Sequence, residues 1–202
     1  MTALSASSAL HVPIEIVPRH VHLSAAHLAH LFGEGYVEHI SRPSRLRGQY
    51  VAEETVTVCG PDGEYAHVRV LGPCRKETQV ELTASEAQAI GIKIVSRLSG
   101  DLARSPGCVL QGPKGEVRLR RGVIVPLAHV HLPATDAKQL KVSQGEAVIV
   151  KLRQAAVDTF GPVFVRVHPT FRPVIHLSQE DAADLWLDHD AYGMLTPAST
   201  GR

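Results

Sequence analysis

The sequence predicts a mostly β fold: two small, pseudo-symmetric β-barrels capped by short α-helices. Three observations lead to this prediction. Short β-branched segments dominate the chain, a Gly-Pro-x-Gly turn occurs in each half, and the motif His-Val-His-Leu occurs twice. Short strands joined by tight turns are typical of small barrels, and repetition of one local pattern indicates an internal duplication.

Two hairpins repeat the same turn. Proline and glycine stand at usable turn positions, between segments rich in valine. The segments are Val56–Cys59 with Val68–Val70 around Gly60–Gly63, and Val109–Gln111 with Val117–Leu119 around Gly112–Gly115. Ala147–Leu152 and Val163–Val167 are expected to add further strands.

Four segments share one strand-to-helix pattern: a β-branched residue, a polar residue, leucine, and then a helix start. The polar residues are His22, Glu81, His131 and His176. Thr83 with Glu86, and Ser178 with Asp181, resemble capping boxes, which begin helices. The expected helices are Ala25–Phe32, Ser85–Ile90, Thr135–Leu140 and Gln179–Leu187.

The repeated His-x-His pairs favour a metal site. Alternate residues of a strand point to the same face, so His20 lies beside His22 and His129 beside His131. With Glu81 and His176 added from the shared polar position, the candidates are five histidines and one glutamate. These residue types are zinc ligands, and they suffice for two sites of three ligands each. A three-ligand site leaves one coordination position of the metal open, as in catalytic zinc sites. The alternative is that they are strand-end histidines with ordinary hydrogen bonds.

Composition excludes several function classes. The formal net charge of this 202-residue chain is +1, and aromatic residues make up 4%, so neither nucleic acid nor a membrane surface is indicated as a partner. The longest apolar runs fall short of the roughly 20 residues of a spanning helix. Three cysteines without paired spacing indicate a reducing compartment. No secretory signal is recognisable before Val12, so the expected location is the cytoplasm.

The order and spacing of several motifs resemble the PduL-type phosphotransacylase (phosphate propanoyltransferase) family, from about Val12 to Leu185. The motifs are Arg19–Ser24, Gly48–Tyr50 with Ala52–Val56, Leu71–Glu81, Ser99–Leu102 and the second His-Val-His. The resemblance implies two β-barrels and two Zn2+ ions per chain, held close together. One zinc ion would take His20, His22 and Glu81, and the other His129, His131 and His176.

The resemblance also implies the domain boundaries. Residues 9–18 and 103–187 would form one barrel, residues 19–102 the other, and residues 188–202 a C-terminal tail. In the same way, Arg75 matches the family arginine that holds phosphate, and Ser99 matches a serine near that anion.

The implied activity is a phosphate acyltransferase. It would move a propanoyl or acetyl group reversibly between coenzyme A and inorganic phosphate, with acyl-CoA and acyl phosphate as substrate and product. The planar fork of Arg75 suits two phosphate oxygens, so we expect direct attack of metal-bound phosphate on the thioester. Coenzyme A carries phosphates, which makes Arg45, Arg47 and Gln49 candidate contacts for it. A covalent route through Cys74, beside Arg75, is the alternative mechanism.

Some positions depart from the family pattern. Ala128 stands where the family commonly has arginine, which would remove positive charge near the second metal, and Arg172 is a candidate replacement. His168 is expected at the surface, with a seventh-ligand role as the alternative. Two other functions stay open: a zinc-dependent thioesterase or phosphoesterase, and a non-catalytic metal-stabilised barrel module. A homodimer and a place inside a bacterial microcompartment, with shell or core proteins as partners, are further expectations.

Overall fold

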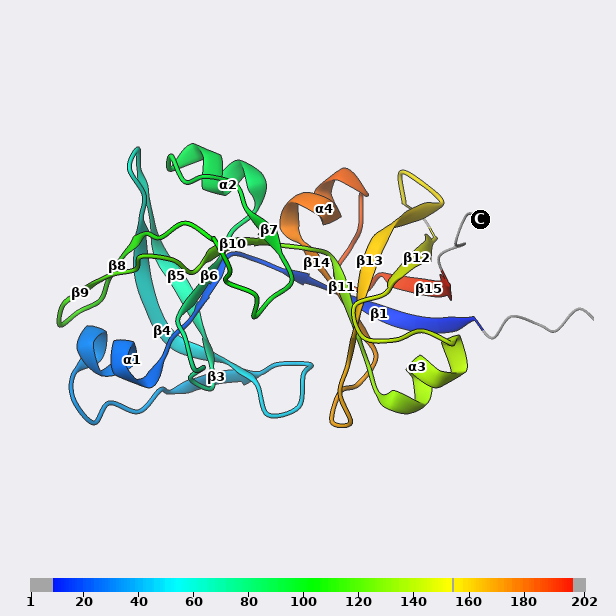
Figure 1. Cartoon of the computed structure of the whole chain (residues 1–202), viewed down its shortest axis with the longest axis horizontal. Coiled ribbons are helices and arrows are strands. Elements are labelled where there is room, and N and C mark those ends of the chain that lie inside the picture. Colours follow the sequence, from blue (N-terminus) through cyan, green and yellow to red (C-terminus); the bar gives the residue numbers. More distant parts are fainter. Residues whose placement is uncertain (1–8, 154, 198–202) are drawn as a thin grey trace, which may run out of the picture. The chain divides into compact units, whose positions relative to one another are not determined.

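The computed structural model describes residues 9–153 and 155–197. Their contacts divide the chain into two compact units (Figure 1). The barrel unit contains the residues up to Val17 and those from Leu127, and the open-sheet unit is Pro18–Pro126. Both consist mainly of strands with a few short helices, so the predicted mostly β fold is confirmed.

The barrel unit is a closed barrel with the strand order β1-β14-β11-β13-β12-β15. Its core consists largely of valine, isoleucine and leucine side chains that point inward from these strands. The strands are β1 (Leu10–Val17), β11 (His129–Leu132), β12 (Ala147–Leu152), β13 (Thr159–Val167), β14 (Val174–Ser178) and β15 (Tyr192–Pro197). Two helices, α3 (Ala134–Leu140) and α4 (Gln179–Asp184), follow β11 and β14 directly.

The open-sheet unit contains a curled sheet with the order β7-β10-β6-β2-β5-β4-β8-β9, and β3 pairs with β4 outside this path. Its strands are β2 (His20–His22), β3 (Ile40–Pro43), β4 (Tyr50–Cys59), β5 (Glu64–Gly72), β6 (Gln79–Glu81), β7 (Ser96–Arg97), β8 (Val109–Gln111), β9 (Glu116–Arg118) and β10 (Val123–Pro126). Helices α1 (Ala25–Phe32) and α2 (Ala84–Ala89) follow β2 and β6. The curled sheet and these helices enclose a separate apolar core.

The four helices start within one residue of where the sequence predicts. The hydroxyls of Ser24, Thr83 and Ser178 accept hydrogen bonds from backbone N–H groups of the first helical turn, and the last two form complete capping boxes. Helix α4 ends earlier than expected, at Asp184. Trp186 has a φ of 56°, a left-handed conformation that a helix cannot continue through.

Two domain boundaries differ from the expected ones. The sequence predicts residues 103–126 in the barrel with residues 9–18, but β8 pairs with β4, and β10 pairs with β6 and β7, in the open-sheet unit. The expected tail at 188–202 includes β15, which pairs with β1 and β12 and closes the barrel. These pairings join segments far apart in sequence, which local patterns do not encode. Residues 198–202 lie outside the described residues.

Within the described ranges, the structure contains no helix that is both long enough and apolar enough to cross a membrane.

Because Leu195 of β15 is completely buried in the barrel core, Leu195→Ala is expected to destabilise the protein by about 2–5 kcal/mol. Urea unfolding of the variant measures this loss, with Met194→Ala on the same strand, where the side chain is only half-buried, as the matched control. A loss at Leu195 no larger than at Met194 would show that β15 does not close the barrel in solution.

Candidate active site

The two histidines of β2 are fixed by backbone carbonyls. His20 Nδ1 lies 2.9 Å from the Pro18 oxygen, and His22 Nδ1 lies 2.9 Å from the Leu71 oxygen. A carbonyl can only accept a hydrogen bond, so both Nδ1 atoms donate, and in the neutral imidazoles both Nε2 atoms carry lone pairs. The two Nε2 atoms are nevertheless only 3.2 Å apart. Two acceptors at this distance, in a buried place, call for a cation between them.

Glu81 completes the first ligand group, which we define as His20, His22 and Glu81. Strand β6 runs antiparallel to β2, with Glu81 directly opposite His20, and Glu81 Oε2 lies 3.5 Å from His20 Nε2. The three ligand atoms all lie within 4.8 Å of one another, and all three residues are buried. The group can therefore hold a metal ion.

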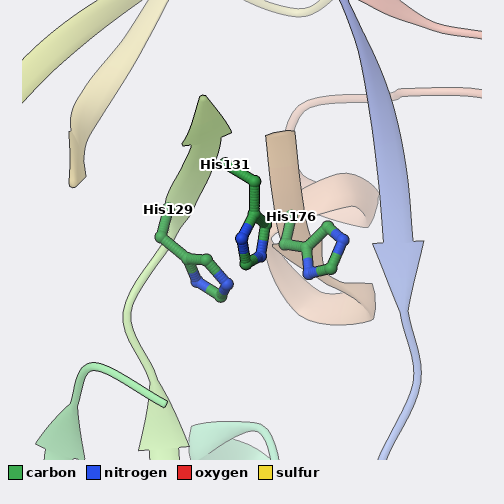
Figure 2. A group of neighbouring side chains, drawn as sticks. All are labelled: His129, His131 and His176. Atoms are coloured by element: carbon green, nitrogen blue, oxygen red, sulfur yellow. The ribbon is translucent and has the colours of Figure 1, made fainter. Parts of the chain in front are cut away.

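The barrel unit repeats this arrangement in the second ligand group, His129, His131 and His176. Strand β14 runs antiparallel to β11, and His176 stands opposite His129 as Glu81 stands opposite His20. Figure 2 shows the three imidazoles gathered from the two strands, and their ligand atoms also lie within 4.8 Å of one another. His129 Nδ1 donates to the Leu127 oxygen at 2.8 Å, so its Nε2 is the lone-pair atom.

The electrostatics of the first ligand group prepare it for a cation. Burial lowers the pKa of His22 well below its usual value, and the neighbouring His20 and Arg75 lower it further, so its imidazole is neutral. Burial alone would raise the pKa of Glu81, but His20 and His22, the Ser99 hydroxyl and Arg75 together lower it to about 2. Glu81 is therefore an ionised carboxylate, and His22 is a neutral imidazole. These are the protonation states that bind metals.

Arg75 is connected to Glu81 through Ser99. Arg75 Nη1 donates to Ser99 Oγ at 3.2 Å, and Ser99 Oγ donates to Glu81 Oε1 at 2.7 Å. The backbone N–H of Arg75 also donates to the Leu23 oxygen at 2.8 Å, which ties this segment to the residue after His22. The structure thus brings the two predicted anion residues, Arg75 and Ser99, to the first ligand group.

Gln79 is a site residue that the sequence reasoning missed. Its buried Nε2 donates to Glu81 Oε1 and, at 3.0 Å, to Ser99 Oγ, while its Oε1 accepts the Gly100 N–H at 2.8 Å. Gln79 therefore holds the Ser99–Gly100 turn against Glu81 of the first ligand group. The signal was present, because Gln79 precedes Glu81 by two residues and so shares its face of β6.

The candidate coenzyme A residues lie in one turn between β3 and β4. Arg45 and Arg47 are exposed on either side of the buried Leu46, and Gln49 is half-buried, its N–H bonded to the Leu46 oxygen at 3.0 Å. Within the described ranges, neither arginine forms an ion pair with a carboxylate. Their charges are therefore directed to solvent, where an anionic ligand could reach them.

Cys74 is a poor candidate for a nucleophile. Burial and the nearby Glu38 carboxylate both raise the pKa of its thiol. Glu38 Oε2 lies 4.0 Å from the sulfur and accepts a hydrogen bond from the Tyr50 hydroxyl at 2.7 Å. A carboxylate at this position disfavours the thiolate, the form that would attack an acyl group.

Arg19 contacts the start of helix α2. Its guanidinium pairs with Glu86 at the start of α2 and stacks on Tyr65, 4.4 Å from the ring centre. In the barrel unit, Ala128 takes the place of Arg19, and the shorter Asp181 takes the place of Glu86 in the capping box. Alanine at position 128 cannot form the contact to a helix start that Arg19 forms with Glu86, and the expected loss of positive charge near the second ligand group stays a prediction.

The remaining candidates lie outside the ligand groups. His168 is exposed, and its Nδ1 is 2.8 Å from the Thr170 hydroxyl, so it is a surface histidine as expected. Arg172 is exposed as well. Neither belongs to a group of described residues that could hold a metal ion.

Comparison with known proteins decides the family. A model of the phosphate propanoyltransferase family matches residues 13–188. The chain belongs to the phosphate propanoyltransferase family. It is therefore an acyltransferase, and its predicted resemblance is confirmed.

Three relatives illustrate the similarity. The phosphate propanoyltransferase of Leptotrichia buccalis is 41% identical over 169 residues, which cover 84% of this chain and 80% of that protein. The one of Listeria monocytogenes is 39% identical over 171 residues, covering 85% and 80%. The one of Thermotoga maritima is 42% identical over 167 residues, covering 81% and 79%.

The lowered pKa of Glu81 predicts a pH dependence of stability in the metal-free protein. The carboxyl has an ordinary pKa of 4.5 when unfolded and about 2 when folded. Its contribution is complete above pH 4.5 and is lost as the pH falls toward 2. Urea unfolding of wild type and Glu81→Gln across this range is the measurement. The stability of the variant should fall less steeply with acid, and equal slopes would contradict the assignment.

Proposed function

We propose that this phosphate propanoyltransferase family member transfers a short acyl group, propanoyl or acetyl, between coenzyme A and inorganic phosphate, with one Zn2+ at each ligand group. The observation that carries the proposal is the chain Arg75–Ser99–Glu81. It places a guanidinium suited to phosphate one hydroxyl away from a buried ligand carboxylate.

Zinc suits the donor set. Two imidazole nitrogens at about 2.0–2.1 Å from one tetrahedral zinc ion lie roughly 3.3–3.4 Å apart, close to the 3.2 Å between His20 Nε2 and His22 Nε2. Each group has three nitrogen or oxygen donors, which leaves a coordination position for substrate. When bound, the ions would supply Lewis acidity that polarises a thioester carbonyl or orients a phosphate oxygen.

Arg75 is proposed to bind and orient the phosphate. A guanidinium offers two parallel N–H donors to two oxygens of one anion. The hydrogen bond from Nη1 to Ser99 restricts the rotamer of Arg75, and the backbone contact to Leu23 fixes the main chain at this residue. Such restriction lowers the entropy cost of placing the nucleophile against the acyl carbon.

The transfer is proposed to be direct. A phosphate oxygen forms a bond to the acyl carbon, the carbon–sulfur bond breaks, and coenzyme A leaves as thiolate. An enzyme nucleophile is not required, and the raised pKa of Cys74 argues against one. Arg45, Arg47 and Gln49 are proposed to contact the phosphates of coenzyme A, since the two arginines direct their charges to solvent.

The cytoplasmic location, the microcompartment with its shell or core proteins, and the homodimer remain predictions from the sequence.

Removal of the Arg75 charge is expected to reduce activity because the enzyme then binds phosphate less well. A hydrogen bond to a charged group contributes about 1.5–3 kcal/mol, so Arg75→Ala should lower kcat/KM for phosphate by roughly 10- to 100-fold, and Arg75→Lys should lower it less. The measurement is coenzyme A release from propanoyl-CoA and acetyl-CoA by zinc-loaded protein at varied phosphate. Arg121→Ala, at an exposed arginine paired with Glu77, is the matched control.

The same assay separates the competing functions. Release that continues without phosphate would indicate a thioesterase and contradict the proposed reaction. Release from neither substrate would favour a non-catalytic metal-binding module or another acyl donor.

Cys74→Ala is expected to retain at least about half of the wild-type turnover, because direct transfer makes no use of the thiol. Single-turnover experiments with labelled propanoyl-CoA should also leave no label on the denatured wild-type protein. A loss of turnover beyond about 100-fold in a folded variant, or label recovered on Cys74, would establish the covalent route instead.

A further inference from the structure

His176 contacts a carboxylate that is not part of either ligand group. Strand β1 runs parallel to β14, and Glu15 is the register partner of His176. Glu15 Oε2 lies 3.1 Å from His176 Nε2, and both side chains are largely buried. The contact joins residues 161 positions apart and lies entirely within the barrel unit.

This contact determines which ring nitrogen of His176 faces the other two histidines. An ionised carboxylate has only acceptors, so Nε2 must carry a proton, and in the neutral imidazole, the form that binds a metal, Nδ1 then has the lone pair. In Figure 2, one ring nitrogen of His176 lies on the side of His131 and the other on the side of β1. Since Nε2 is bonded to Glu15 of β1, the nitrogen on the His131 side is Nδ1.

The opposite holds for the ligand histidines whose partners are backbone carbonyls. His20, His22 and His129 each donate through Nδ1 and present Nε2. His176 therefore differs from them in its tautomer and in the charge of its partner.

We propose that Glu15 is a positioning residue for the second ligand group: it fixes His176 so that Nδ1 binds the metal, and its negative charge makes that imidazole a stronger ligand. The inference rests on the metal site of the proposed function. A carboxylate behind a ligand histidine orients the ring and raises its basicity, and loss of such a partner typically costs 10- to 100-fold in metal affinity.

The first experiment uses the wild-type chain. In zinc-loaded protein with 15N-labelled histidine, long-range proton–nitrogen correlation spectra distinguish metal-bound from protonated ring nitrogens. The expected result is a zinc-bound Nδ1 and a protonated Nε2 for His176, with the reverse for His20, His22 and His129. A zinc-bound Nε2 on His176 would overturn the inference while leaving the metal site intact. Spectra unchanged by zinc at His129 and His176 would overturn both.

The second experiment measures zinc affinity by competition with a chelator. Glu15→Ala should weaken one of the two sites by about 10- to 100-fold and leave the other unchanged. Glu15→Gln, whose carbonyl oxygen still accepts the Nε2 proton, should weaken it less. Glu116→Gln, at an exposed strand glutamate, is the matched control. Wild-type affinity at both sites in a folded Glu15→Ala variant would overturn the inference.

Discussion

Each ligand group depends on one constraint, the antiparallel pairing of its His-x-His strand with a strand that places the third residue of the group directly opposite the first histidine. His20 faces Glu81 and His129 faces His176 in the same register. The residue between the histidines, Val21 or Val130, is completely buried. Because side chains alternate along a strand, a slip by one residue would bring histidines into the apolar core. Core packing and ligand geometry therefore enforce the same register.

Much of this arrangement could be predicted because it depends on local geometry. The period of two puts His20 beside His22, and the repeated pattern at Glu81 and His176 marks the third ligand in each unit. The helix starts after Thr83 and Ser178 follow from capping boxes that lie within a few residues. The strand-to-helix pattern thus indicated four of the six ligand candidates, and the His-x-His pairs added His20 and His129.

What the sequence did not reveal depends on pairing between distant segments. Strand β8 pairs with β4, and β10 pairs with β6. No local sequence pattern indicates these pairings. Residues Tyr192–Pro197 lie in the stretch expected to be a tail, yet they form β15, which pairs with β1 and β12 and closes the barrel. Glu15 lies in an ordinary strand pattern, and only the pairing of β1 with β14 brings it to His176.

The two ligand groups deal with buried charge in complementary ways. The first includes the carboxylate of Glu81, and its outer neighbour is the cation Arg75, connected through Ser99. The second consists of three imidazoles, and its outer neighbour is the anion Glu15. In each group the neighbour carries the charge that the ligands lack. Isolated buried charges are costly. A positive charge in place of Glu15 would therefore disfavour a divalent cation at the second group. A negative charge in place of Arg75 would disfavour an anionic substrate at the first. The duplicated fold therefore holds two similar ligand sets in different electrostatic surroundings, with a cation beside the first and an anion beside the second.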